Sequence, residues 1–397
     1  MPCAYTVRKT LRLLARQQGR LLRLPKSYAA AFFSVFMSRQ IRIKDIAAQT
    51  GVSPGTVDRV LHNRGNVAPE VRARVLQVMQ EMGYEPNLMA RSLASNRKAL
   101  HIAAILPDYR TDLYWAQPKE GVERAAEAVR HYGVTVAFHF FPLFDPSAFL
   151  DVVKKVLETR PGAVLFAPLF LHESEFLIRE TTRLDIPKVM INTHIEHTDA
   201  LCYIGQDSYQ SGVLAGRLLD FGLDDGDQAM VLSLDKGVSN ARHLLDKERG
   251  FKDFFHGVEH KSIEVHSEIC EDFDHPELLR TWVYQQFEKH PRLHGFFVTN
   301  SRAYKLAQVL DPGTQKRVKI VGFDLIEPNL ALLNDNKIGF LMNQNPWHQG
   351  YLGILAIVNK LILKKEIDPN QHLPLDIVVK ENAEYYSRRR VVLNAVH

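Results

Sequence analysis

The chain has 397 residues, of which 46% are hydrophobic and 24% are charged. This length exceeds what one hydrophobic core usually organises, so we expect two or three folding units of globular rather than disordered composition. No apolar run approaches the roughly 18 residues of a membrane-spanning helix. The three cysteines, Cys3, Cys202 and Cys270, are widely spaced, which excludes a disulfide framework and a CxxC metal or redox site and suits a reducing cytosol.

The net charge of +5 is unevenly distributed along the chain. Residues 1–36 carry +7 with no acid, residues 37–98 carry +5, and the remainder carries −7. A basic N-terminal part followed by an acidic remainder predicts a small polyanion-binding head and a larger domain with a different function.

Residues 1–37 form a basic, leucine-rich extension. Arginines interrupt its apolar residues, and the apolar stretch at 29–36 is too short for a secretory signal. We interpret the extension as sequence upstream of the true start at Met37. The alternative is a translated basic arm that adds non-specific contacts to phosphate.

Three short helices are predicted in a domain at residues 38–86. The first covers 44–49, and the second is capped by Ser53 and has Pro54 at its first position, where a missing N–H is no loss. The third runs over 69–83 with valines at helical spacing. Three such helices sharing one small core are typical of a helix-turn-helix module, whose second helix enters the major groove of DNA.

The segments TVDRVLHNRGNV and VRARVLQVMQEMGYEPNLMARSLASNR resemble the LacI/GalR family of bacterial transcription repressors, over residues 41–98. The resemblance implies that Pro54 and Gly55 stand where family members read base edges, so direct readout there is poor. Asp58 can accept from a cytosine amino group and Arg59 can bridge guanine O6 and N7; the alternative for Asp58 is a surface acid repelled by phosphate. The DNA-binding residues implied in this module are Ser53, Pro54, Gly55, Thr56, Asp58, Arg59 and Asn63, with Thr56 and Asn63 on phosphates.

Residues 87–98 correspond to the hinge of the same family. Asn87, Ala90 and Leu93 lie on one face at helical spacing, and a helix this short does not persist in isolation. The resemblance implies that it orders when two copies meet in the minor groove, where Leu93 wedges between base pairs and bends the duplex. The alternative is a flexible linker whose Leu93 packs on the large domain.

Residues 99–397 alternate apolar strands with amphipathic helices, which predicts parallel sheets covered on both faces. Helices are expected at 119–132, 148–159, 208–221 and 275–290. Strands are expected at 101–107, 134–141, 162–168, 188–193, 202–207, 228–234, 263–269, 294–300, 319–324 and 338–344. The fold class is therefore an all-α helix-turn-helix head followed by an α/β domain of two doubly wound lobes. Residues 100–390 resemble the effector domain of the same family, which is periplasmic-binding-protein-like (type I).

Candidate ligand-binding residues follow the ends of these strands, because ligands in doubly wound folds sit at the carboxyl ends of strands. They combine carboxylates and amides, which bind hydroxyls, with aromatic rings, which cover C–H patches, a mixture that suits a carbohydrate. The candidates are Asp112, Tyr114, Trp115, Asn192, Thr193, Asn300, Asp324 and Gln344. Family members also place an arginine ahead of a Gly-Phe pair; here Arg242, His243 and Lys247 remain open for that role, and we select His243.

No metal, cofactor or catalytic site is expected. The histidines at 194–199 and 172–173 lack HExxH spacing, and neither a phosphate-binding loop nor a nucleophile elbow occurs. We predict a cytoplasmic, nucleoid-associated regulator that binds double-stranded operator DNA and a small sugar-like effector as a homodimer, or as a tetramer, without contact to a membrane. The alternatives are a solute-binding protein of a sugar transporter and a sugar-modifying enzyme.

Overall fold

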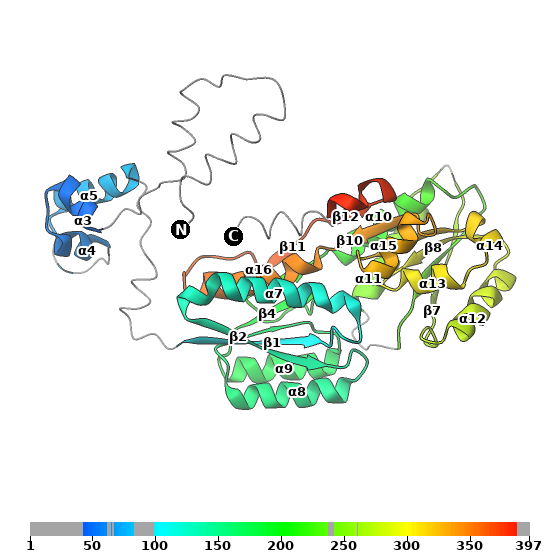
Figure 1. The fold of residues 1–397 in the computed structure, drawn as a ribbon, viewed down its shortest axis with the longest axis horizontal. Coiled ribbons are helices and arrows are strands. Elements are labelled where there is room, and N and C mark those ends of the chain that lie inside the picture. The colour runs from blue at the N-terminus through cyan, green and yellow to red at the C-terminus, as the bar shows by residue number, and fades with distance from the viewer. Residues whose placement is uncertain are drawn as a thin grey trace, which may run out of the picture. The chain divides into compact units, whose positions relative to one another are not determined.

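The structure is a computed structural model that describes residues 43–61, 65, 67–82, 99–236, 242–259 and 261–386. It divides into two compact units, Met1–Leu88 and Met89–His397 (Figure 1). The extension at 1–37, the hinge at 87–98 and the implied DNA-binding residues Asn63, Asn87, Ala90 and Leu93 lie outside the described residues.

The first unit contains the three predicted helices, α3 (Ile43–Thr50), α4 (Pro54–Leu61) and α5 (Pro69–Glu81). Its core is small: Ile46, Val57 and Val75 are completely buried. The turn before α4 has Gly51 at φ +68°, a left-handed conformation that glycine adopts without strain. The Ser53 hydroxyl then accepts from the Thr56 backbone N–H at 3.1 Å, which caps α4 as predicted.

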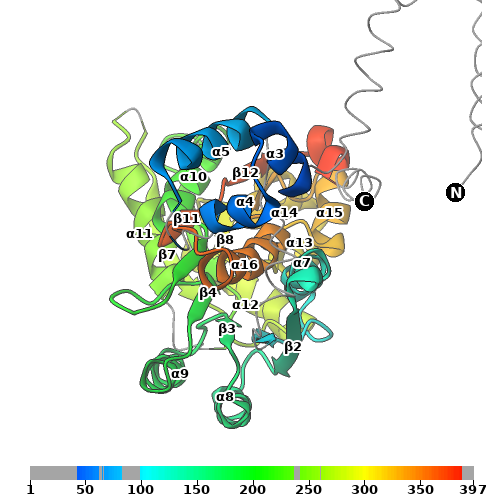
Figure 2. The same cartoon turned by 90° about the vertical axis from the view of Figure 1, so that its left-hand side faces the viewer.

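The second unit consists of two α/β lobes. In the described residues, lobe 1 has a six-stranded parallel sheet in the order β11-β5-β4-β3-β1-β2. Its strands are β1 (Leu100–Pro107), β2 (Val134–Phe141), β3 (Ala163–Phe166), β4 (Lys188–Asn192), β5 (Cys202–Gly205) and β11 (Asn370–His372). Both faces are covered, by α7 (Ala116–Val129) and α16 (Pro346–Leu361) on one side and α8 (Pro146–Thr159) and α9 (Leu171–Arg183) on the other (Figure 2).

Lobe 2 repeats this architecture with the order β12-β10-β9-β8-β6-β7 among the described residues, and only β12 runs antiparallel to its neighbour. Its strands are β6 (Gln228–Ser233), β7 (Glu264–Ile269), β8 (Leu293–Val298), β9 (Lys319–Phe323), β10 (Phe340–Asn343) and β12 (Asp376–Val378). Its helices are α10 (Ser208–Asp220), α11 (Arg242–His256), α12 (Pro276–Lys289), α13 (Ala303–Val309), α14 (Pro312–Arg317) and α15 (Glu327–Asn334). The predicted fold class is confirmed, and the ten predicted strands are present. Two further strands, β11 and β12, were not predicted, and each adds a sixth strand to its sheet.

In the described part of the chain, three segments connect the lobes: one after β5, one after β10 and one between β11 and β12. They are hydrogen-bonded to one another. Leu373 N–H donates to Gly205 O at 2.7 Å, and Asn345 Nδ2 donates to Pro374 O at 2.8 Å and to Asp376 Oδ2 at 3.1 Å. Three bonded connections form a hinge that favours bending of the lobes over their separation.

Helices α10 and α11 approach each other through glycine. A Cβ on Gly212 would lie 1.9 Å from the backbone oxygen of Lys247, and a Cβ on Gly250 would lie 2.0 Å from that of Tyr209. This close packing holds α11, and with it the side chain of Lys247, at the edge of the lobe that faces lobe 1. Among the described residues, no helix is long and apolar enough to span a membrane.

Candidate functional site

The predicted reading helix α4 presents one polar face. Val57 and Val60 are buried in the core of the first unit, whereas Pro54, Gly55 and Arg59 are exposed. Thr56 and Asp58 are half-buried at the edge of the same face. The helix therefore offers Arg59 as the long side chain that can reach a base edge, beside Pro54 and Gly55, neither of which has a hydrogen-bonding side chain.

A cleft of about 80 Å³ lies between the two lobes of the second unit. Eight of the nine predicted ligand residues line it: Asp112, Tyr114, Trp115, Asn192, His243, Asn300, Asp324 and Gln344. The ninth, Thr193, is buried behind this lining, with its hydroxyl 3.4 Å from Nδ1 of His243. The lining residues that the sequence analysis did not select are Leu143, Phe144, Leu169, Gln206, Asp235, Lys247, Thr299, Ser301 and Arg302.

The first wall of the cleft begins at the short 3-10 helix η1 (Leu113–Trp115), which follows β1. Asp112 caps η1, because its Oδ1 accepts from the Tyr114 N–H at 3.1 Å. The Tyr114 hydroxyl accepts from Asn192 Nδ2 at 2.7 Å, and its ring meets Trp115 edge-on at 5.0 Å. Burial raises the pKa of Tyr114 well above its usual range, so its hydroxyl keeps a proton that it can donate.

The ends of β4 and β5 complete this wall. Asn192 has φ +70°, a left-handed conformation that turns the chain at the strand end. The Tyr203 hydroxyl lies between two backbone oxygens, 3.2 Å from that of Asn192 and 3.0 Å from that of Gln206. The Gln206 side chain is 3% exposed, and its Oε1 has no hydrogen-bond partner among the described residues. A buried acceptor without a donor is costly, so a ligand hydroxyl is a suitable partner for it.

The opposite wall is built around Asp324, which is 1% exposed and follows β9 with φ +69°. Gln344 Nε2 donates to both of its carboxylate oxygens, at 3.0 and 2.9 Å, while Gln344 Oε1 has no partner among the described residues. Lys247 Nζ donates to Thr299 O at 2.7 Å and lies 3.8 Å from the centre of the Phe323 ring.

Burial shifts the protonation of both charged groups on this wall. It raises the pKa of Asp324, against the hydrogen bonds from Gln344 and the charge of Lys247. It lowers the pKa of Lys247, against the charge of Asp324. Each group therefore favours the charged form of the other, and the Gln344 hydrogen bonds favour the carboxylate of Asp324 further, but burial outweighs these effects in both pKa values.

The structure answers part of the question that the sequence left open about Arg242, His243 and Lys247, the three candidates ahead of the Gly-Phe pair. His243 and Lys247 both line it, whereas nothing is described for the side chain of Arg242. Lys247 stands three residues before Gly250, and its place ahead of the Gly-Phe pair was the signal that made it one of the three open positions. Arg302 was missed because it lies two residues past Asn300, beyond the strand end that guided the selection. No group of three or more His, Cys, Asp or Glu side chains able to hold a metal occurs in the described ranges.

Comparisons with known proteins agree with both units. The model of the periplasmic binding protein domain matches residues 102–366, and that of bacterial regulatory proteins of the lacI family matches residues 42–87. The ribose operon repressor of Halalkalibacterium halodurans is 25% identical over 354 residues, which cover 86% of this chain and 97% of the repressor. The transcriptional regulator MalR of Streptococcus pneumoniae is 37% identical over 102 residues, 24% of this chain and 30% of MalR.

Solved structures share the fold of the second unit. A putative LacI transcriptional regulator from Bacteroides fragilis has a TM-score of 0.65 at 24% identity and covers 73% of this chain and 100% of its own. An ABC transporter solute-binding protein from Agrobacterium vitis, bound with α-D-tagatopyranose, has a TM-score of 0.64 at 23% identity and covers 73% and 98%. With a lacI-type helix-turn-helix head ahead of a periplasmic-binding-protein domain, the chain belongs to the lacI family and is a DNA-binding transcriptional regulator.

Proposed function

We propose that this regulator represses genes of sugar uptake or catabolism and that a small uncharged carbohydrate in the cleft controls its DNA affinity. The observation that carries the proposal is the cleft itself. Its lining offers the Tyr114 hydroxyl as a donor and the two unpartnered amide oxygens of Gln206 and Gln344 as acceptors. Hydroxyl groups, which both donate and accept, can satisfy all three.

The charges of the cleft favour an uncharged ligand. Arg302 is paired with Asp112 at 2.5 Å. A carboxylate or phosphate that bound Arg302 would have to displace Asp112 and leave this acid buried without its partner, which is strongly unfavourable. A neutral polyol leaves the pair intact.

The size of the cleft implies movement. A volume of about 80 Å³ holds only a few water molecules, so a sugar ring enters when the lobes open about their three connections. Binding then changes the equilibrium between lobe arrangements, and the coupling free energy to the DNA site changes operator affinity.

The head supports a symmetric DNA target. We infer that two copies of α4 read the half-sites of a near-palindromic operator, as a homodimer or as a tetramer of such dimers. Ser53, Pro54, Gly55, Thr56, Asp58 and Arg59 are its proposed contacts. Asn63 and the hinge residues Asn87, Ala90 and Leu93 remain proposals outside the described residues. Since the operator is chromosomal, we infer a cytoplasmic, nucleoid-associated location.

The relatives support the sugar class of the effector. They include a ribose operon repressor, and the solved solute-binding domains include complexes with D-arabinose and D-allose. Neither alternative accounts for the lacI-type head at 42–87, whether the protein is a transporter solute-binding protein or a sugar-modifying enzyme.

Fluorescence anisotropy tests the proposal. Purified protein is titrated at fixed salt onto labelled promoter DNA from its own gene, with and without D-ribose, D-tagatose, D-arabinose or D-allose, because affinities for DNA depend steeply on salt. We expect nanomolar binding and at least a tenfold change with one sugar, in line with typical coupling. The uncharged effector would be refuted if a wider set of neutral sugars left DNA binding unchanged while a sugar acid or a sugar phosphate altered it.

A further inference from the structure

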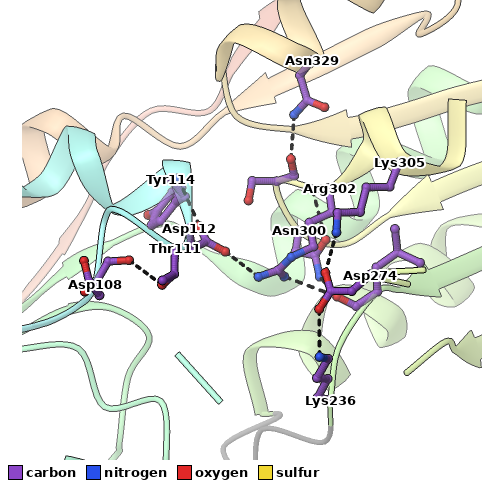
Figure 3. A network of polar contacts seen from close by, with 12 residues as sticks. Asp108, Thr111, Asp112, Tyr114, Lys236, Asp274, Asn300, Arg302, Lys305 and Asn329 are labelled. Carbon is purple, nitrogen blue, oxygen red and sulfur yellow. Dashed lines mark hydrogen bonds and ion pairs between the residues drawn. The ribbon is translucent and has the colours of Figure 1, made fainter. Parts of the chain in front are cut away.

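An ion pair crosses the mouth of the cleft. Arg302, at the start of α13 in lobe 2, donates from Nη2 to Oδ2 of Asp112, which precedes η1 in lobe 1, at 2.5 Å (Figure 3). The two side chains are 10% and 11% exposed. Because this pair is largely withdrawn from water, solvent screens it much less than a surface ion pair.

Further hydrogen bonds hold both residues of the ion pair in place. Arg302 Nη1 donates to Leu234 O at 3.3 Å, and its backbone N–H donates to Asn300 Oδ1 at 3.2 Å. Asn300 Nδ2 in turn donates to the same Leu234 oxygen at 3.0 Å. On the other side, the cap on η1 fixes Asp112. Each charge is therefore already oriented when the lobes meet, so the pair forms without ordering a free side chain.

Aromatic rings surround the guanidinium. Its central carbon lies 5.3 Å from the ring centre of Phe144 in lobe 1 and 5.1 Å from that of Phe273 in lobe 2, and the two rings are 6.0 Å apart. Cation–π contacts of this kind strengthen as water is excluded. The ion pair and the ring contact thus join the same two lobes at the same place.

An ionic cluster fixes the lobe-2 side of this contact. Asp274 accepts from Lys236 Nζ at 2.8 Å and from Lys305 Nζ at 2.6 Å (Figure 3). Lys236 also lies 5.6 Å from the Phe273 ring centre, and Lys305 lies 4.8 Å from it. The cluster ties the loop that carries Phe273 to α13, which begins directly after Arg302.

The pair also borders two spaces, the cleft of about 80 Å³ and a second cavity of about 380 Å³. Asp112, Phe144 and Arg302 line both.

We propose that Asp112, Phe144, Phe273 and Arg302 form a latch that holds the two lobes closed before any effector binds. Arg302 is a positioning residue in this device: it holds Asp112 across the cleft and sets how often the cleft opens. The proposal goes beyond the sugar response, because it concerns the protein without ligand and without DNA.

Trp115 reports on the latch, because it lines the cleft and is only 3% exposed. In full-length protein carrying W282F and W347F, acrylamide quenching of fluorescence measures access to Trp115 alone. We expect R302M to raise the quenching constant about threefold as the open population grows, and to raise the radius of gyration in solution scattering. R183M is the matched control, because Arg183 pairs with Glu180 inside α9 of lobe 1 and crosses no cleft.

The charge swap D112R/R302D separates pairing from mere loss of a side chain. A latch predicts that the double variant returns quenching toward the wild-type value, while R302D alone stays open. The latch is overturned if R302M and R183M show equal quenching. It is also overturned if quenching in R302M rises while the radius of gyration stays unchanged, because that would be a local effect at Trp115. If circular dichroism shows that R302M fails to fold, R302K is measured instead and must still quench more than R183M. Since no sugar or DNA is used, these outcomes leave the proposed function to its own test.

Discussion

The glycine contact between α10 and α11 allows a direct test of how packing positions the cleft. The change is G212A. Its Cβ would lie 1.9 Å from the Lys247 backbone oxygen, whereas Cβ contacts under 3.0 Å essentially do not occur, and Phe251 N would lie only 2.8 Å away. The obstacles are helix backbone rather than a flexible side chain, so α11 must shift by roughly 1 Å, and overpacking of this kind costs about 1–3 kcal/mol.

Urea unfolding followed by intrinsic fluorescence measures that free energy. The matched control is G257A at the end of α11, where a Cβ meets nothing closer than 3.6 Å; its free energy of unfolding should differ from wild type by less than about 0.5 kcal/mol. Because Lys247 moves with α11, G212A should also weaken the effect of sugar on DNA binding, while DNA binding without sugar persists. Equal unfolding midpoints for G212A and G257A would refute the argument from close helix packing.

Three further predictions concern other parts of the chain. R59A should relax base preference at one operator position as well as weaken binding, which a binding survey over single-base operator variants detects; uniform weakening would indicate phosphate contact only. I46A removes a fully buried side chain from the head and should destabilise it by about 2–5 kcal/mol, abolishing operator binding while calorimetry still detects sugar binding. Burial raises the pKa of Asp274, but Lys236 and Lys305 outweigh it, so the net pKa lies below 3.8. Wild type should therefore be more stable than D274N at pH 7, and urea midpoints should converge as the pH falls below 3.8.

Much of the fold could be predicted because the strands of a parallel sheet are buried on both faces and appear as apolar runs. The same logic placed Asp112, Asn192 and Asp324 at one edge of their sheets, where the structure brings them together. Strands β11 and β12 could not be found this way. They are three residues long and lie at sheet edges, and β11 has the sequence NQH, which carries no apolar signal.

The missed cleft residues had a different cause. Gln206 directly follows β5 but lay inside the predicted strand 202–207, and Arg302 lies two residues past Asn300. The role of Arg302 depends on Asp112 of lobe 1, which lies within 2.5 Å of it. The two residues are 190 positions apart in the chain, so no local pattern connects them. Lys247 was one of three positions left open ahead of Gly250 and Phe251, and the sequence analysis selected His243; both side chains line the cleft.

The late position of α16 in the sequence has a consequence for folding during translation. This helix covers the lobe-1 sheet beside α7, and Gly353 brings it within van der Waals reach of Leu165 and Ile191. The helix and β11 belong to lobe 1 although nearly all of lobe 2 precedes them in sequence. On the ribosome the head can fold as soon as it emerges, whereas the part of the lobe-1 sheet face that α16 covers stays exposed beside α7 until residues 346–372 emerge. Nascent chains stalled before that point should be the ones that recruit chaperones.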